Sequence, residues 1–154
     1  MEKVEKIILV DNLTSISEIE TFSDCIDTKF ITFDYASHIK LTEKKIKHEI
    51  SENYSNNEID QLQKKCYNFL DWHELDIIKN NINFLGVNIP KLYDDQLIHV
   101  IVKIVKKFSE LKSVITKFRN VNYFASGELF LLSNLLVESV SEIQNAKNNE
   151  FYFD

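Results

Sequence analysis

Glycine and proline are scarce in this chain, which has two glycines and one proline among 154 residues. Glycine-rich loops let the backbone approach phosphate groups closely, and no G-x-G-x-x-G or P-loop sequence is present. Long flexible linkers also depend on these residues. We therefore expect neither a glycine-rich phosphate loop nor an extended linker.

Cysteine is equally sparse, with Cys25 and Cys66 far apart and no C-x-x-C pair. Both lie in apolar segments of helical pattern, where a buried free thiol is favoured over a disulfide. This usage indicates a reducing, cytoplasmic setting. The four histidines show no ligand spacing, and no serine lies in a nucleophile elbow. The sequence thus predicts no metal site, no cofactor and no catalytic residue.

Membrane and nucleic-acid partners are disfavoured by the hydropathy and the charge. No apolar run approaches the roughly 20 residues that span a bilayer, and the first apolar run is too short for a signal peptide. The net charge of −6 repels a phosphate backbone. We expect no transmembrane segment and no nucleic-acid partner.

Two short apolar runs end abruptly at an aspartate. Four apolar residues, 7–10, lead into Asp11, and Phe30, Ile31 and Phe33 lead into Asp34. Such runs are typical of buried strands that deliver a polar side chain to the edge of a sheet. A helix predicted over 15–26, with a capping box at Ser15 and Glu18, joins the two strands into a βαβ unit.

The remaining pattern completes an α/β fold. We predict a small parallel, Rossmann-like sheet of about four strands in the order 3-2-1-4, flanked by helices. It forms a single domain over 1–143 that contains a helical insertion at about 55–119, and the tail 144–154 is flexible or docks through its aromatic residues. The later elements are a helix at 36–45, an edge strand at 46–50, a capped helix from Ser55 to about 73 with a second piece through 82, a long helix at 93–118, a strand at 120–125 and a helix at 129–143.

The strand order reverses between the first and fourth strands, and the crevice there is the expected ligand site. Asp11, Asn12, Ser126 and Gly127 line it, with Asp34 beside them. Paired carboxylates hold Mg²⁺ or bind sugar hydroxyls, but aspartate is also a common helix cap.

Two other features belong to this expected site. Ser126 and Gly127 open a helix whose free N–H groups suit a phosphate, unless Ser126 simply caps the helix. His38 lies four residues beyond Asp34 on the presumed ligand side. The alternative for His38 is a partly buried residue without a functional role.

Several short motifs resemble a known family. They are Phe33-Asp34-x-x-x-His38, Ile46-x-His48-x-Ile50-Ser51-x-x-Tyr54, the helix of residues 59–72 and Phe124-Ala-Ser-Gly127. Together they resemble the N-terminal domain of surface-polysaccharide biosynthesis proteins related to GT-B glycosyltransferases.

The resemblance implies the first half of a Rossmann-like domain that binds a carbohydrate, a nucleotide-sugar ligand or a partner transferase domain. In that family a second Rossmann domain normally carries the nucleotide-sugar site, and this chain stops where it would begin. The chain is then an incomplete or non-catalytic part of a glycosyltransferase.

A second resemblance is to response-regulator receiver domains, whose first strand also precedes an acidic pair. Here the pair is Asp11 and Asn12, Asp34 comes too early to accept a phosphoryl group, and no lysine follows the last strand at the required place.

Two further functions stay open. The helix predicted at 93–118 either packs within its own chain or forms the seam of a homodimer, which would make the chain a protein–protein interaction module. An Mg²⁺-dependent phosphoryl transfer by Asp11 and Asp34 is the remaining alternative. The apolar residues of the long helix recur at spacings of three and four: Leu97, Ile101, Ile104, Phe108, Leu111, Ile115 and Phe118.

Overall fold

The computed structural model describes residues 4–51, 55–76, 83, 84, 87, 88 and 90–144. They divide into a sheet unit, residues 1–52 and 110–154, and a helical unit, residues 53–109. The predictions for 77–82 and for the tail beyond Gln144 fall outside the described residues.

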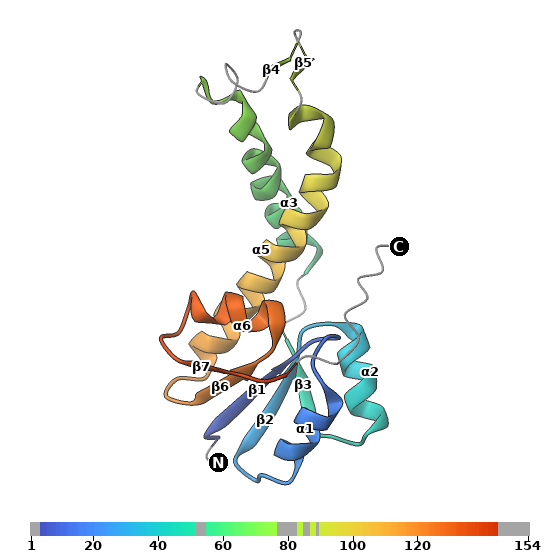
Figure 1. Ribbon diagram of the computed structural model, residues 1–154, viewed down its shortest axis with the longest axis vertical. Coiled ribbons are helices and arrows are strands. Elements are labelled where there is room, and N and C mark those ends of the chain that lie inside the picture. Colours follow the sequence, from blue (N-terminus) through green and yellow to red (C-terminus); the bar gives the residue numbers. More distant parts are fainter. Residues whose placement is uncertain (1–3, 52–54, 77–82, 85–86, 89, 145–154) are drawn as a thin grey trace. The chain divides into compact units, whose positions relative to one another are not determined.

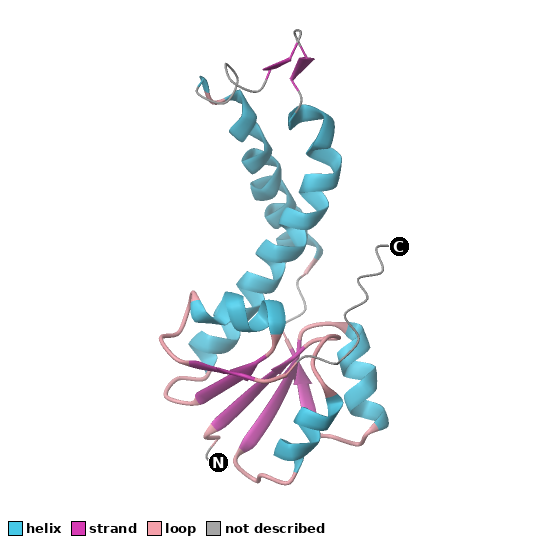
Figure 2. Ribbon diagram, viewed as in Figure 1, coloured by secondary structure: helices cyan, strands magenta, loops and turns pink. Residues whose placement is uncertain are grey.

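The helices and strands follow the alternation expected of an α/β chain (Figures 1 and 2). The sheet unit contains β1 (Lys6–Val10), α1 (Ile16–Ser23), β2 (Thr28–Thr32), α2 (Tyr35–Glu43), β3 (His48–Ile50), the end of α5 (Asp94–Lys117), β6 (Asn122–Ala125), α6 (Gly127–Asn134) and β7 (Val140–Glu142). The helical unit contains α3 (Asn56–Leu70), a 3₁₀ turn (Asp71–Glu74), β4 (Asn83–Phe84), β5 (Val87–Asn88), a second 3₁₀ turn (Pro90–Tyr93) and the beginning of α5.

The main sheet is parallel throughout, with its strands in the order β3-β2-β1-β6-β7. Ile8 of β1 lies opposite Phe30 of β2 and Phe124 of β6. The predicted α/β fold and its order of four strands are confirmed, and β7 adds a fifth strand. The order reverses at β1, because β2 and β3 follow on one side of it and β6 and β7 on the other.

The prediction of one helix from Leu129 to Ile143 is wrong in its second half. α6 ends at Asn134, and Val140–Glu142 pairs with β6 as β7. Val140 and Ile143 are three residues apart, which fits a helix, but the edge of β6 offers backbone partners: the N–H of Ile143 donates to the carbonyl of Ala125 over 2.9 Å. Strand pairing here overrides the local pattern.

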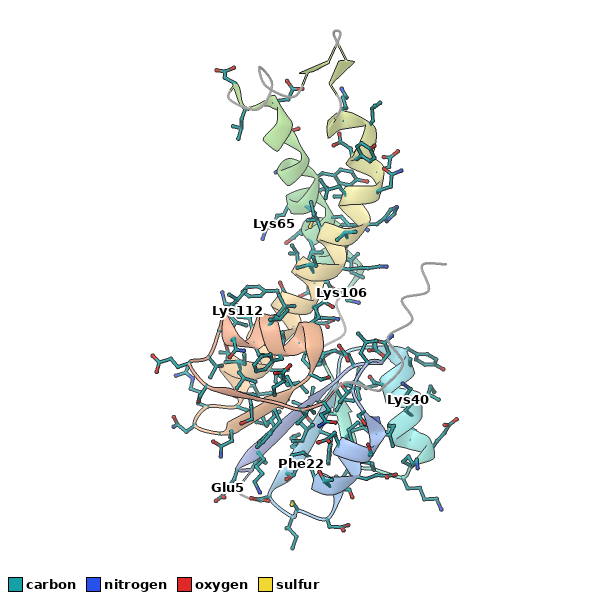
Figure 3. All side chains as sticks on the ribbon, in the orientation of Figure 1. Glu5, Phe22, Lys40, Lys65, Lys106 and Lys112 are labelled. Carbon is teal, nitrogen blue, oxygen red and sulfur yellow. The ribbon has the colours of Figure 1, made fainter. Side chains whose placement is uncertain are left out.

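Helices cover both faces of the sheet, so residues 7–10 of β1 are all apolar and alternate between two clusters. On one of these faces Phe22 of α1 packs against Phe124, with ring centroids 5.0 Å apart (Figure 3). One cluster contains Ile7, Leu9, Ile31, Leu111, Val114, Tyr123, Ala125 and Leu129, and the other contains Ile8, Val10, Ile19, Phe30, Leu41 and Ile143.

The helical unit has a small core of its own around Cys66 of α3 and Ile98 of α5. Cys66 and Cys25 are free thiols, as predicted, and burial raises the pKa of the Cys66 thiol. Within the part of the chain that the structure describes, no helix combines the length and the apolar character required to cross a bilayer.

Of the two predicted capping boxes, one is confirmed and one is wrong. The N–H of Ser55 donates to Oε2 of Glu58 over 2.8 Å, and the N–H of Glu58 donates back to Oγ of Ser55 over 3.4 Å. The side chain of Ser15 makes no cap bond, because its hydroxyl instead lies 2.8 Å from that of Ser17.

Replacing Leu111 by alanine should destabilise the sheet unit by about 2–5 kcal/mol, because this fully buried side chain of α5 would leave a cavity. Leu131→Ala is the matched control: Leu131 of α6 is 66% exposed, and its truncation should cost less than about 0.5 kcal/mol. Urea unfolding followed by circular dichroism measures both variants. Equal losses would contradict the packing of α5 on the sheet.

Candidate functional site

Loops that follow neighbouring parallel strands meet where the strand order reverses. Asp11 follows β1, Asp34 lies two residues after β2, and Ser126 follows β6 directly. In open parallel sheets, ligands bind in the crevice at such a reversal. The structure therefore brings these three residues, with their neighbours Asn12 and Gly127, to the same edge of the sheet.

Asp11 is buried in a turn that fixes the loop after β1. Its Oδ1 accepts hydrogen bonds from the N–H of Leu13 at 3.0 Å and from Oγ1 of Thr14 at 3.1 Å. Oγ1 of Thr14 also lies 2.9 Å from Oγ of Ser126. Because the single hydroxyl proton of Thr14 goes to Asp11, Ser126 is the donor in this last bond. The network connects β1 to β6 across the reversal.

Asp34 has a second, separate set of partners. Its Oδ1 accepts the N–H of Ser37 at 2.7 Å, which caps α2, and its Oδ2 accepts the N–H of Asn12 at 2.7 Å. Lys40 of α2 donates to the carbonyl of Asn12 over 2.8 Å (Figure 3). The two aspartates thus end adjacent strands, as expected, and each orders the loop that follows β1.

The beginning of α6 is organised differently from that of α2. Ser126 occupies the N-cap position, but it makes no side-chain cap bond, since its hydroxyl is directed to Thr14. Gly127 follows with φ of 49°, a left-handed value that glycine adopts without steric cost. This helix start is not covered by its own N-cap side chain and has no Cβ on its first residue, two features that suit an anion. The acidic Glu128 also lies in this first turn.

His38 does not join this group. Its Nδ1 lies 2.7 Å from Nε2 of His48 on the edge strand β3, and Nδ1 of His48 lies 2.7 Å from the carbonyl of Ile46. A carbonyl only accepts, so His48 carries its proton on Nδ1 and, when neutral, receives the Nδ1 proton of His38 on Nε2.

Sequence reasoning missed four residues that build these contacts: Thr14, Ser37, Lys40 and His48. A signal for the first two was present, because Asp11-x-x-Thr14 and Asp34-x-x-Ser37 share a spacing typical of turns and caps. Lys40 and His48 are brought in by tertiary packing, which no local pattern reports.

Asp11 and Asp34 both accept hydrogen bonds from the loops and helices that they order, so both carboxylates have a structural role at this edge. Across the residues with described positions, no three histidine, cysteine or acidic side chains converge as metal ligands.

Replacing Asp34 by alanine should destabilise the sheet unit by about 1–3 kcal/mol, because it removes a helix cap and a charge-assisted bond to the loop after β1. Asp24→Ala removes an exposed carboxylate from the end of α1 and should change the stability by less than about 0.5 kcal/mol. Chemical unfolding compares the two. An Asp34 variant as stable as the Asp24 variant would contradict the ordering role of Asp34.

Comparison of the chain with protein-family models, with curated proteins and with solved structures found no match. The geometry of the sheet edge is therefore what supports a function.

Proposed function

We propose that the sheet unit binds a carbohydrate or nucleotide-linked ligand where the strand order reverses, at Asp11, Asn12, Asp34, Ser126 and Gly127. In this proposal the chain is the non-catalytic N-terminal part of a glycosyltransferase-like protein of surface-polysaccharide biosynthesis. The observation that carries the proposal is the beginning of α6, where Ser126 bonds to Thr14 instead of capping the helix.

The phosphate of a nucleotide-linked ligand would bind the first turn of α6. The helix dipole places partial positive charge there, and the N–H groups of a first turn have no partner inside their helix. The absence of a Cβ at Gly127 allows the backbone to approach the phosphate closely. Because Ser126 bonds to Thr14, its hydroxyl does not occupy the N–H groups that the phosphate would bind.

Asn12 supplies a contact for sugar hydroxyls. Its side chain is exposed, while its backbone is held on both sides by Asp34 and Lys40. A carboxamide both donates and accepts hydrogen bonds, as a hydroxyl does. A rigid backbone that presents an open polar side chain lowers the entropic cost of binding.

Catalysis is assigned to a partner transferase domain. The two aspartates order loops in this chain, and the sequence carries no nucleophile motif. The activity of the assembled protein would then be sugar transfer, with this unit holding one of the substrates.

Titration with UDP-glucose and UDP-N-acetylglucosamine tests the proposal by thermal unfolding. A ligand at 100 times its dissociation constant should stabilise the protein by about 2.7 kcal/mol. Gly127→Ala should abolish this gain, because the new methyl group occupies the approach to the first turn of α6 and strains the backbone.

Asn120→Ala is the matched control. Asn120 also has a positive φ, of 59°, but it precedes β6 and so lies at the amino edge of the sheet. Its replacement by alanine should cost a similar strain of about 1–2 kcal/mol and leave the ligand effect intact. The proposal fails if neither nucleotide sugar stabilises the wild type, or if both variants respond like it.

A second function, association with another copy of the chain, is favoured by exposed residues of α5. Of the predicted seam, Leu97 and Ile101 pack inside the helical unit, whereas Ile104 is 40% exposed. Val100, one turn away on the same face of the helix, is 53% exposed. These two side chains form an apolar strip that a second copy would cover.

Sedimentation of the protein over a range of concentrations measures this association. Ile104→Lys should convert a dimer to a monomer, because it places a charge in the apolar contact. His99→Lys adds the same charge at an exposed position about 100° around α5 from Val100, outside the strip, and should leave the dimer intact. A monomer at every concentration, or two variants that behave alike, would rule out the strip as an interface.

A further inference from the structure

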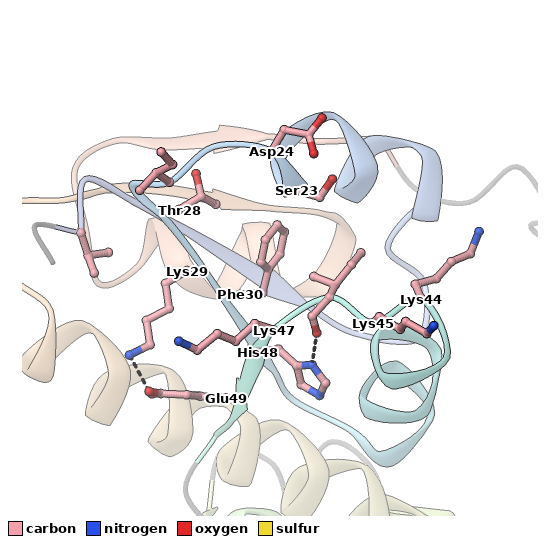
Figure 4. A pocket seen from close by; sticks show the side chains of 13 residues that line it. Ser23, Asp24, Thr28, Lys29, Phe30, Lys44, Lys45, Lys47, His48 and Glu49 are labelled. Atoms are coloured by element: carbon pink, nitrogen blue, oxygen red, sulfur yellow. Dashed lines mark hydrogen bonds and ion pairs between the residues drawn. The ribbon is translucent and has the colours of Figure 1, made fainter.

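A second polar pocket lies at the amino ends of β2 and β3, at the opposite edge of the sheet from the site above (Figure 4). Its volume is about 650 Å³, within the size range of small-molecule sites. The ends of α1 and α2 border it, through Asp24 and Lys44. Phe30 of β2, only 4% exposed, contributes an apolar surface.

Lysine dominates the charge of this pocket. Lys29, Lys44, Lys45 and Lys47 line it together with two carboxylates, so four positive charges face two negative ones in a chain of net charge −6. Figure 4 shows the ammonium groups of Lys29 and Lys47 on the same side of the pocket. The pocket therefore attracts anions within an acidic protein.

Two of the four lysines form ion pairs with glutamates. Nζ of Lys29 lies 2.5 Å from Oε1 of Glu49, and this hydrogen bond lowers the pKa of the glutamate. Nζ of Lys44 lies 2.9 Å from Oε1 of Glu20. Within the described part of the chain, the ammonium groups of Lys45 and Lys47 have neither an ion pair nor a hydrogen bond, and they remain available to a ligand.

Lys45 is held in a conformation that lysine rarely adopts. Its φ is 57°, and it ends α2 in a Schellman motif: its N–H donates to the carbonyl of Thr42 over 3.0 Å, and that of Ile46 to the carbonyl of Leu41 over 2.9 Å. Glycine is the usual residue at this position, because a Cβ is strained there. A lysine in its place brings a positive charge to the pocket at a steric cost.

Compensation of the helix dipoles does not explain the whole cluster. The ends of α1 and α2 carry partial negative charge, which nearby lysines offset. Lys44, the C-cap residue of α2, satisfies this need. Lys47 lies beyond the helix, next to the start of β3, and is exposed.

Thr28 also lines the pocket, but its Oγ1 is buried and is not open to it. The hydroxyl is therefore no donor to a ligand, and the charges of the lysines are what would hold one.

We propose that this pocket binds a ligand bearing more than one phosphate, held by the ammonium groups of Lys45 and Lys47. The ligand is either a free phosphorylated compound or the head group of an anionic lipid, which share this chemistry. Ile26, 92% exposed at the rim, would contact the membrane in the second case only.

Tripolyphosphate is the probe for the free compound, with isothermal titration calorimetry and backbone NMR of the full chain. Binding should shift the amide signals of Thr28, Lys45 and Lys47 and weaken steeply with salt. Lys47→Gln should weaken it at least fivefold, while Lys112→Gln removes the same charge from an exposed position of α5 and should not change it (Figure 3).

Lys45→Gly separates ligand binding from folding. Glycine relieves the left-handed strain, so this variant should unfold at a temperature no lower than the wild type and still bind tripolyphosphate at least fivefold more weakly. A lower unfolding temperature with unchanged binding would contradict the role given to Lys45.

Co-sedimentation with phosphatidylcholine vesicles, with and without phosphatidylserine, tests the lipid source. Binding to the anionic vesicles that is reduced by Ile26→Ser and by Lys47→Gln supports a head group, and binding of tripolyphosphate alone supports a free compound. The proposal is overturned if neither binds, or if Lys47→Gln and Lys112→Gln behave alike. Gly127→Ala should leave the pocket unaffected, so failure of the nucleotide-sugar site and failure of this pocket are distinguished.

Discussion

Parallel pairing of β1 with both β2 and β6 is the constraint on which the rest of this molecule depends. A central parallel strand has no free edge and both of its faces must be covered, which explains why residues 7–10 of β1 are all apolar and buried. The same pairing forces the chain to cross from one side of β1 to the other. At this crossing, hydrogen bonds among Asp11, Thr14 and Ser126 join the loops that follow β1 and β6.

The sheet also explains why the two ends of its strands differ in chemistry. Helices that connect parallel strands begin at the carboxyl edge and end at the amino edge, so their dipoles present positive charge at the first and negative charge at the second. Side chains of opposite charge offset the helix dipoles at both edges. Asp34 caps the beginning of α2, and Lys44 lies at its end, paired with Glu20. Most of the charge near the sheet follows from this rule and needs no ligand to account for it.

The sequence predicted the fold well where a signal was local and strong. The apolar runs that end at Asp11 and Asp34, and the long periodic helix, correspond to β1, β2 and α5. β7 was missed because Val140 and Ile143 fit a helix equally well, and the unpaired edge of β6 decided between the two. The edge that holds Asp11, Asp34 and Ser126 was predictable, since parallel strands end together. The pairing of His38 with His48 was not, because it depends on how α2 packs against β3.

Two residues of the proposed sites occupy positions that other residues or other contacts would stabilise better. Ser126 stands at an N-cap and does not cap, and Lys45 stands where glycine would be relaxed. A sequence under selection for stability alone would correct each with one substitution, whereas functional sites are where such local conflicts are retained. The two departures occur at opposite edges of one sheet. In the two proposals they would act on anions in different ways, one through backbone N–H groups and the other through ammonium groups, so binding at one edge would not require binding at the other.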